Sequence, residues 1–182
     1  AQQTLAPLGH TVEGLLIDGK RPDFNEPKEL GLEPVAEAKI LQALTLIEGT
    51  ELEGSAILVE DSGIFLDAFP NWPGAESSDV EKEIGLSGII EKVNKSEIRG
   101  AEFRAVAILS DGSNFWKSKG VCRGSISHEI KGQKGFGYDP IFIPSEGDGR
   151  TFGELGAEVK NQISHRKKAM QGLSNLLKSP SR

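Results

Sequence analysis

The sequence has 182 residues but only one cysteine, one methionine and one tyrosine. The single cysteine, Cys122, excludes an internal disulfide bond and a cysteine-rich zinc site. No apolar run approaches the ~20 residues that a membrane-spanning helix needs. Residues 1–5 lack the basic stretch and apolar segment that mark a signal peptide. These absences predict a cytoplasmic protein with no membrane partner.

The sequence also lacks an excess of positive charge. It has 21 Lys and Arg residues against 27 Asp and Glu residues, which gives a net charge of −6. Proteins that bind a nucleic acid polymer usually have a basic excess or a basic stripe. Only residues 166–168 form a basic run here, so we expect no nucleic acid polymer as a partner. A small anionic ligand remains open, because a bound metal ion can supply positive charge locally.

The order of the predicted elements indicates an α/β protein. Apolar runs predict strands at residues 12–17, 56–59 and 141–143, and helical periodicity marks residues 36–47, 80–93 and 163–177. Residues 103–126 read as a hairpin that turns at Asp111-Gly112. Alternating strands and helices, a central hairpin and a closing helix predict a mixed β-sheet flanked by helices.

The first cluster with chemical potential is Glu60-Asp61-Ser62-Gly63, where the predicted strand ends. Neighbouring strand residues point to opposite faces, so Glu60 and Asp61 should not share a role. One of them could bind a divalent ion while the other is structural, and Gly63 permits a tight turn. The alternative is an ordinary polar turn after a strand.

The second cluster is the loop of residues 134–140, which contains two glycines around Phe136. Glycines let the backbone approach a flat ligand, and Phe136 could stack on a base. Asp139 could accept hydrogen bonds from the ring N–H or exocyclic groups of that base. The alternative is a glycine-rich loop with a core Phe and a turn Asp.

The third cluster runs from Lys160 to Lys168, where a helix is predicted to begin at Ser164. His165 and Arg166 supply donors for purine atoms, and Lys160 offers a point charge for a phosphate. The alternative is a solvated cationic face. Upstream, a glutamate of the acidic loop at residues 25–29 could complete a magnesium site with Asp61, although a solvated loop is the plainer reading.

Together these clusters resemble the inosine triphosphate pyrophosphatase family. The resemblance rests on residues 59–63, 135–142 and 163–166, with further matches at Trp72-Pro73-Gly74, at residues 150–155 and at Lys160. The order and spacing of these motifs agree with the family over nearly the whole chain.

The resemblance implies a two-lobed α/β domain over residues 1–182, with a long mixed sheet, an active-site cleft between the lobes and a homodimer. It implies an enzyme that hydrolyses purine nucleoside triphosphates such as ITP, dITP and XTP to the monophosphate and pyrophosphate, with Mg²⁺. Asp61 would be the catalytic base and a metal ligand. Glu29 would be the second metal ligand in one alignment of the loop, and Glu26 in another. The implied substrate-binding residues are Ser62, Lys39, Phe136, Gly137, Tyr138, Asp139, Lys160, His165 and Arg166.

Two departures from the family pattern stand out. The family begins with a strand and a Ser/Thr-x-Asn-x-x-Lys loop that grips the triphosphate, and no such motif is present here. We therefore expect the chain to lack this strand and loop, which keeps a non-catalytic purine-nucleotide-binding protein as an alternative. After Gly74, residues 75–79 include Glu76 and Asp79 where the family usually has a Tyr-Ser stretch near a basic residue. These acidic residues should alter the edge of the cleft or the dimer contact.

Overall fold

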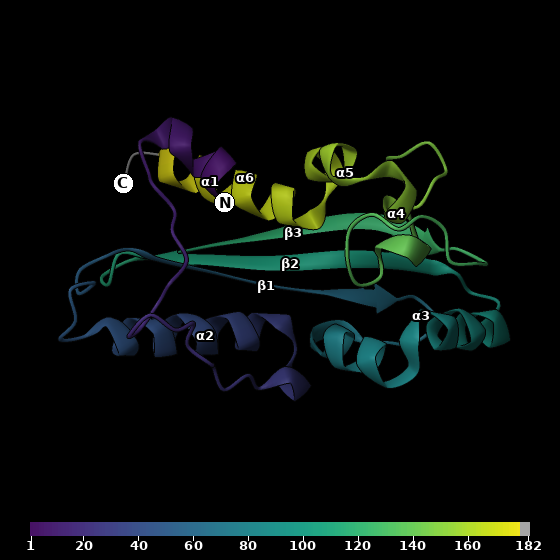
Figure 1. Cartoon of the computed structure of the whole chain (residues 1–182), viewed down its shortest axis with the longest axis horizontal. Coiled ribbons are helices and arrows are strands. Elements are labelled where there is room, and N and C mark those ends of the chain that lie inside the picture. Colours follow the sequence, from purple (N-terminus) through teal and green to yellow (C-terminus); the bar gives the residue numbers. More distant parts are fainter. Residues whose placement is uncertain (179–182) are drawn as a thin grey trace.

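The computed structural model describes residues 1–178, which form a four-stranded sheet with helices on both faces (Figure 1). The strands are β1 (Ile57–Leu66), β2 (Gly100–Ser110), β3 (Phe115–Ile126) and β4 (Phe142–Pro144). The helices are α1 (Gln2–Leu5), α2 (Leu32–Ile47), α3 (Ser77–Ser96), α4 (Phe152–Leu155), α5 (Ala157–Ile163) and α6 (His165–Lys178). Short 3₁₀ turns occur at Ala6–Leu8, Lys28–Leu30, Gly74–Glu76 and Asp139–Ile141. The α/β class and the helices flanking a sheet are therefore confirmed.

The strand pairing differs from the expected mixed sheet. Within residues 1–178 the order is β1-β2-β3-β4, and every neighbouring pair is antiparallel. Residues 12–17 do not form the predicted strand. The turn at Asp18-Gly19 folds this segment back on itself, so that Ile17 and Lys20 exchange two backbone hydrogen bonds of 2.9 and 3.0 Å. The end of the segment is thereby paired locally instead of along another strand.

Strand β1 is longer than its apolar run predicts. Its pairing with β2 continues from Ile57 opposite Ser110 to Leu66 opposite Ala101, so Glu60 and Asp61 lie within the strand. Gly63 therefore does not form the predicted turn. A Cβ atom at Gly63 would lie 2.0 Å from the carbonyl oxygen of Gly74, so the glycine allows the 3₁₀ turn Gly74–Glu76 to pack directly on β1.

Each long helix packs its apolar side against one face of the sheet. Helix α2 contributes Ile40 and Ala43 to a core with Val59, Val106 and Ile108. Helix α6 covers the other face and contributes Ala169, Met170 and Leu173 to a core with Ala105 and Ala107. A third core, richer in aromatic residues, lies where β1 and β3 end. Its members include Ile64, Ile89, Val93, Phe103, Ile126, Phe142 and Phe152.

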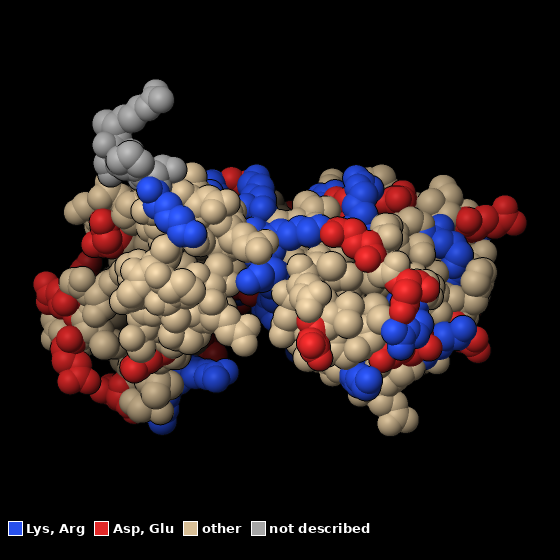
Figure 2. Space-filling view, turned by 90° about the horizontal axis from the view of Figure 1, so that it is seen from above, with Lys and Arg blue, Asp and Glu red and all other residues tan. Residues whose placement is uncertain are grey.

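The start of α6 lies very close to β3. A Cβ atom at Gly120 would lie 2.0 Å from the carbonyl oxygen of His165, so only glycine permits this approach. Ser164 accepts a hydrogen bond from the Lys167 amide at 3.2 Å, which confirms the predicted cap. Seen from the α6 side, the molecular surface narrows in the middle of its long axis, and Lys and Arg side chains gather there (Figure 2).

Candidate active site

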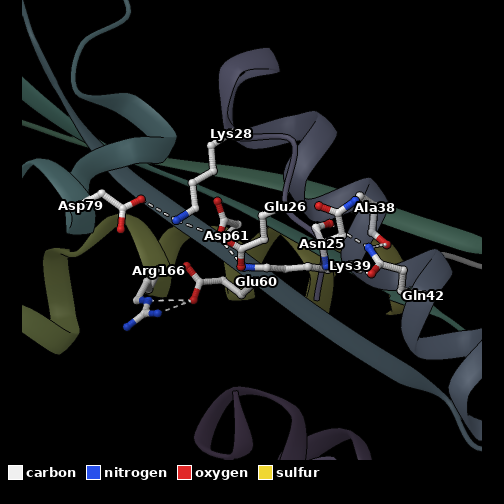
Figure 3. Close-up of polar contacts among 10 residues, drawn as sticks. All are labelled: Asn25, Glu26, Lys28, Ala38, Lys39, Gln42, Glu60, Asp61, Asp79 and Arg166. Carbon is white, nitrogen blue, oxygen red and sulfur yellow. Dashed lines mark hydrogen bonds and ion pairs between the residues drawn. The ribbon is translucent and has the colours of Figure 1, made fainter. Parts of the chain in front are cut away.

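Asp61, Lys39 and Glu26 form a three-residue charge cluster on the α2 side of β1 (Figure 3). The Lys39 ammonium lies 2.7 Å from Asp61 Oδ1 and 2.7 Å from Glu26 Oε1. Lys39 projects from α2, Asp61 from β1, and Glu26 from the loop before α2. Asp61 is the catalytic base that the family resemblance implies and Lys39 is one of the implied substrate-binding residues, and the fold brings the two into direct contact.

The electrostatics of this cluster shift the pKa values of its two carboxylates in opposite directions. Burial is the largest influence on Asp61, and the charges of Glu26 and Glu60 add to it, so its pKa is raised although Lys39 opposes the shift. Burial lowers the pKa of Lys39, but its hydrogen bonds to Asp61 and Glu26 outweigh burial and leave that pKa raised. The pKa of Glu26, by contrast, is lowered: burial alone would raise it, but the hydrogen bond and charge of Lys39, with those of Lys28, outweigh burial.

The structure separates the two candidate metal glutamates. Glu26 lines a hollow of about 480 Å³ together with Lys39 and Glu60. Glu29 is exposed and lines a different hollow of about 520 Å³, which also contains Arg104 and Lys119. The 3₁₀ turn Lys28–Leu30 begins right after Pro27 and carries Glu29 away from Asp61. Of the two alternatives, only Glu26 shares a direct partner with Asp61 within residues 1–178.

Asp79 lies at the edge of this cluster. The Lys28 ammonium is 2.7 Å from Asp79 Oδ2 and 3.5 Å from Glu26 Oε2. The hydrogen bond from Lys28 is the largest influence on Asp79 and lowers its pKa. The acidic residue that departs from the family pattern is thus paired with a lysine of the Glu26 loop.

The loop at residues 134–140 presents an exposed aromatic ring held by a buried carboxylate. Phe136 is 66% exposed, and the Lys160 ammonium lies 4.2 Å from the centre of its ring. Asp139 is 1% exposed. Its Oδ2 atom accepts hydrogen bonds from the Phe136 amide at 3.0 Å and from Lys160 at 2.5 Å. Its Oδ1 atom is buried and has no hydrogen-bond partner within the described chain, whereas most buried carboxylate oxygens have one.

Tyr138 and the two glycines shape this loop. The Tyr138 hydroxyl donates a hydrogen bond of 2.9 Å to the Ser77 carbonyl at the start of α3, and burial raises the pKa of this hydroxyl. Gly135 has φ +80°, and a Cβ atom there would lie 2.0 Å from Asp139 Oδ2. Gly137 also has a positive φ, +60°. The Tyr138 hydrogen bond to Ser77 holds the loop against α3. The two glycines have no side chain and therefore leave space beside Phe136.

His165 lies beneath the same loop as a buried, neutral imidazole. Its ring stacks on Phe103 with the ring centres 4.7 Å apart and an interplanar angle of 9°. Burial, followed by the charges of Arg166 and Lys160, lowers the pKa of His165 to about 3. Its Nδ1 atom is buried and has no hydrogen-bond partner among residues 1–178. A neutral imidazole can donate or accept one hydrogen bond at each nitrogen according to its tautomer.

Arg166 lies between the two halves of the site. Its Nε and Nη2 atoms both lie 2.7 Å from Glu60 Oε2, and its guanidinium carbon lies 5.8 Å from the centre of the Phe136 ring (Figure 3). As predicted from strand alternation, Glu60 and Asp61 point to opposite faces: Glu60 meets α6 and Asp61 meets α2. No local pattern in the sequence predicts that Arg166 is the partner of Glu60, because the two residues are 106 positions apart.

The remaining predicted residue, Ser62, is half-buried on β1 opposite Ala105. Within residues 1–178, no group of three His, Cys, Asp or Glu side chains is close enough to enclose a metal ion by itself. The pair Asp61 and Glu26 still fits Mg²⁺ in donor chemistry, since this ion is usually bound by one or two carboxylates, waters and substrate phosphates. No described helix is long and apolar enough to cross a membrane.

This fold and site define an α/β protein in which a carboxylate–lysine cluster and an exposed aromatic ring flank the same arginine. The Ham1 family model matches residues 1–176, and the chain belongs to this family. It is 42% identical to the dITP/XTP pyrophosphatase of Saccharolobus solfataricus over 123 residues. The aligned region covers 68% of this chain and 64% of that relative. It is 39% identical to the dITP/XTP pyrophosphatase of Methanopyrus kandleri over 180 residues. Here the aligned region covers 98% of this chain and 89% of that relative.

A solved structure agrees with the family assignment. The Ham1 protein of Staphylococcus aureus matches with a TM-score of 0.74 and 28% identity, over 86% of this chain and 80% of that one. The chain thus spans somewhat less than two thirds of the S. solfataricus relative and most of the other two proteins.

Proposed function

We propose that this protein hydrolyses purine nucleoside triphosphates with a 6-oxo base, such as dITP, ITP and XTP, to the monophosphate and pyrophosphate. The observation that carries the proposal is the joining of two half-sites through Arg166: Asp61 with Lys39 on one side, and Phe136 with Asp139 on the other. The printed names of the relatives, dITP/XTP pyrophosphatase, support the same substrate class.

The base would stack on Phe136, with the glycines of the loop allowing close approach. Asp139 Oδ1 and His165 Nδ1 are both buried without a partner in the described chain, so they are suited to the polar edge of a flat ligand. Arg166 can donate a hydrogen bond to the exocyclic 6-oxo oxygen of the base. Adenine presents a 6-amino group where these purines have an oxygen, so a donor aimed at that oxygen would stay unpaired. Tyr138 would act from beneath, by holding the loop through Ser77.

The chemistry would take place beside Asp61. A water oxygen attacks the α-phosphorus, the α–β anhydride P–O bond breaks, and pyrophosphate leaves. Asp61 would accept the proton of that water, a role favoured by its raised pKa and its position beside Lys39. Lys39 would then offset the negative charge of the phosphates. Lys160 would contact the nucleotide from the base side, and Ser62 would touch the substrate next to Asp61.

We also propose Asp61 and Glu26 as the residues that would hold Mg²⁺; Glu26 replaces Glu29 because of its shared contact with Lys39. A magnesium ion would supply charge neutralisation at the phosphates, as is general in phosphoryl transfer. We further propose that the domain has two lobes, that the protein is a homodimer and that it is cytoplasmic. The alternative of a non-catalytic nucleotide-binding protein is not favoured, because the relatives carry the name of an enzyme.

Asp61→Asn tests the proposal at its chemical centre. We expect wild-type protein to release pyrophosphate from dITP with Mg²⁺. The substitution removes the proposed base while keeping the size of the side chain, so kcat should fall roughly 100-fold or more. Circular dichroism and binding of inosine monophosphate should be retained. The control is Asp148→Asn, which disrupts an exposed pair with Arg150 outside the site. Near-normal turnover by Asp61→Asn would contradict the proposed role of Asp61 as the base.

A further inference from the structure

Glu60 is the acidic residue of the site that the proposed reaction does not use. Its Oε2 atom receives two N–H groups of Arg166, each at 2.7 Å. Its Oε1 atom is buried and has no hydrogen-bond partner among residues 1–178. The Glu60 side chain is 17% exposed, compared with 47% for Arg166. A mostly buried carboxylate on a strand therefore holds a longer and more exposed side chain.

Strand β1 connects this pair directly to the reacting end of the site. Asp61 follows Glu60, and the two side chains leave opposite faces of the strand, toward Lys39 of α2 and Arg166 of α6. Consecutive Cα atoms are ~3.8 Å apart and are joined by a planar peptide. Both residues lie in an unbroken ladder with β2, where they face Ala107 and Val106. The backbone positions of Glu60 and Asp61 are thus fixed relative to each other by one peptide unit within a sheet.

The surroundings of Arg166 show why its orientation needs a partner. Burial disfavours its charge, but the hydrogen bond to Glu60 and the charges of Glu60, Asp61 and Asp139 raise its pKa. Three carboxylates from both half-sites therefore attract the same guanidinium. Only Glu60 forms a hydrogen bond with it in the described chain. In Figure 3 the third nitrogen of the guanidinium points away from Glu60.

We propose that Glu60 is a positioning residue that holds Arg166 at one place between Phe136 and Asp61, and thereby aligns the base with the reacting phosphate. The inference rests on the proposed function, because it assigns a task to Arg166 within that site. Glu60 needs no contact with the substrate. It acts by limiting the orientations of an arginine that three carboxylates attract.

A double-mutant cycle tests the inference through nucleotide binding. Calorimetry gives the Kd of inosine monophosphate for wild type, Glu60→Ala, Arg166→Ala and the double variant. We expect Glu60→Ala to weaken binding roughly 10-fold, the lower end of what losing an orienting partner costs. The double variant should bind like Arg166→Ala alone, because Glu60 acts only through that arginine. With dITP, Glu60→Ala should raise KM far more than it lowers kcat.

Two further variants separate positioning from general stability. Glu60→Gln keeps an oxygen acceptor, so it should recover part of the binding that Glu60→Ala loses. It also carries the test if thermal unfolding shows that Glu60→Ala does not fold. Glu33→Ala is the matched control, because Glu33 is likewise a carboxylate with two short cationic contacts, in this case to Lys117 and Lys119 of β3, away from Arg166. It should leave Kd and KM unchanged.

The inference would be overturned if Glu60→Ala bound inosine monophosphate as well as Glu33→Ala does. It would equally fail if the effects of Glu60→Ala and Arg166→Ala were fully additive. Failure of the proposed function looks different: wild type would bind the monophosphate but release no pyrophosphate from dITP, and the binding cycle would still decide the role of Glu60. Wild type that binds no inosine nucleotide would defeat both.

Discussion

At the scale of single residues, His165 combines burial with an unprotonated ring. It is 4% exposed, lies flat on Phe103, and has a pKa of about 3 against an ordinary value of 6.5. The nearby charges of Lys160 and Arg166 oppose a proton on its ring. A neutral imidazole here can serve a purine edge without adding charge to a site that already holds two cations.

This lowered pKa makes the stability of the protein depend on pH. Between pH 6.5 and about 3 the unfolded chain binds a proton at His165 and the folded protein does not. The free energy of unfolding should therefore decrease as the pH falls from 6.5. By pH 5 the loss from this group should be about 2 kcal/mol, at ~1.4 kcal/mol per pH unit.

Urea unfolding of wild type and His165→Gln near pH 7 and pH 5 measures this effect. The variant has no imidazole to titrate, so the difference in stability between wild type and variant should shrink at the lower pH. An unchanged difference between the two pH values would show that His165 takes up its proton equally well in the folded protein.

At the scale of elements, the contact between α6 and β3 sets the position of the base half of the site. Gly120 on β3 faces the first turn of α6, and a Cβ atom there would lie 2.0 Å from the His165 carbonyl oxygen and 2.5 Å from the Ala169 amide. Both obstacles are backbone atoms, which cannot rotate away. Any side chain at this position must lift the start of α6, and with it His165 and Arg166.

Gly120→Ala should therefore reduce the free energy of unfolding by about 1–3 kcal/mol, as overpacked cores do. It should also raise KM for dITP, because Arg166 would no longer lie at its position near Phe136. The control is Gly14→Ala, since nothing lies within 4 Å of a Cβ atom at Gly14. Equal stability and equal KM for the two variants would contradict the close packing of α6 on β3.

At the scale of the whole molecule, local signals in the sequence predicted the three long helices α2, α3 and α6 and the β2–β3 hairpin. Apolar periodicity and the Asp111-Gly112 turn act over a few residues, and so does the Ser164 cap. The predicted length of β1 was wrong, because the polar run Glu60-Asp61-Ser62 resembles the end of a strand. Pairing with β2 keeps this run extended, and that partner is remote in sequence.

The same distinction applies to the site. The three motifs drew attention to Asp61, Phe136 and Asp139 as candidates, because each stands in an unusual local pattern. Sequence spacing could not decide between Glu26 and Glu29, since the answer depends on how the loop turns after Pro27. Sequence spacing also could not predict the pairing of Glu60 with Arg166, because only the fold brings these two residues, 106 positions apart, into contact.

The central claim is that one site joins base recognition to cleavage of the phosphate chain. The most direct test compares pyrophosphate release from dITP, XTP, ATP and dUTP with Mg²⁺, using the intact chain. We expect kcat/KM for dITP and XTP to exceed that for ATP by roughly 100-fold or more, because a donor aimed at a 6-oxo group finds no acceptor on adenine. Equal release from ATP, or a preference for dUTP, would contradict the roles given to Phe136, Asp139 and Arg166.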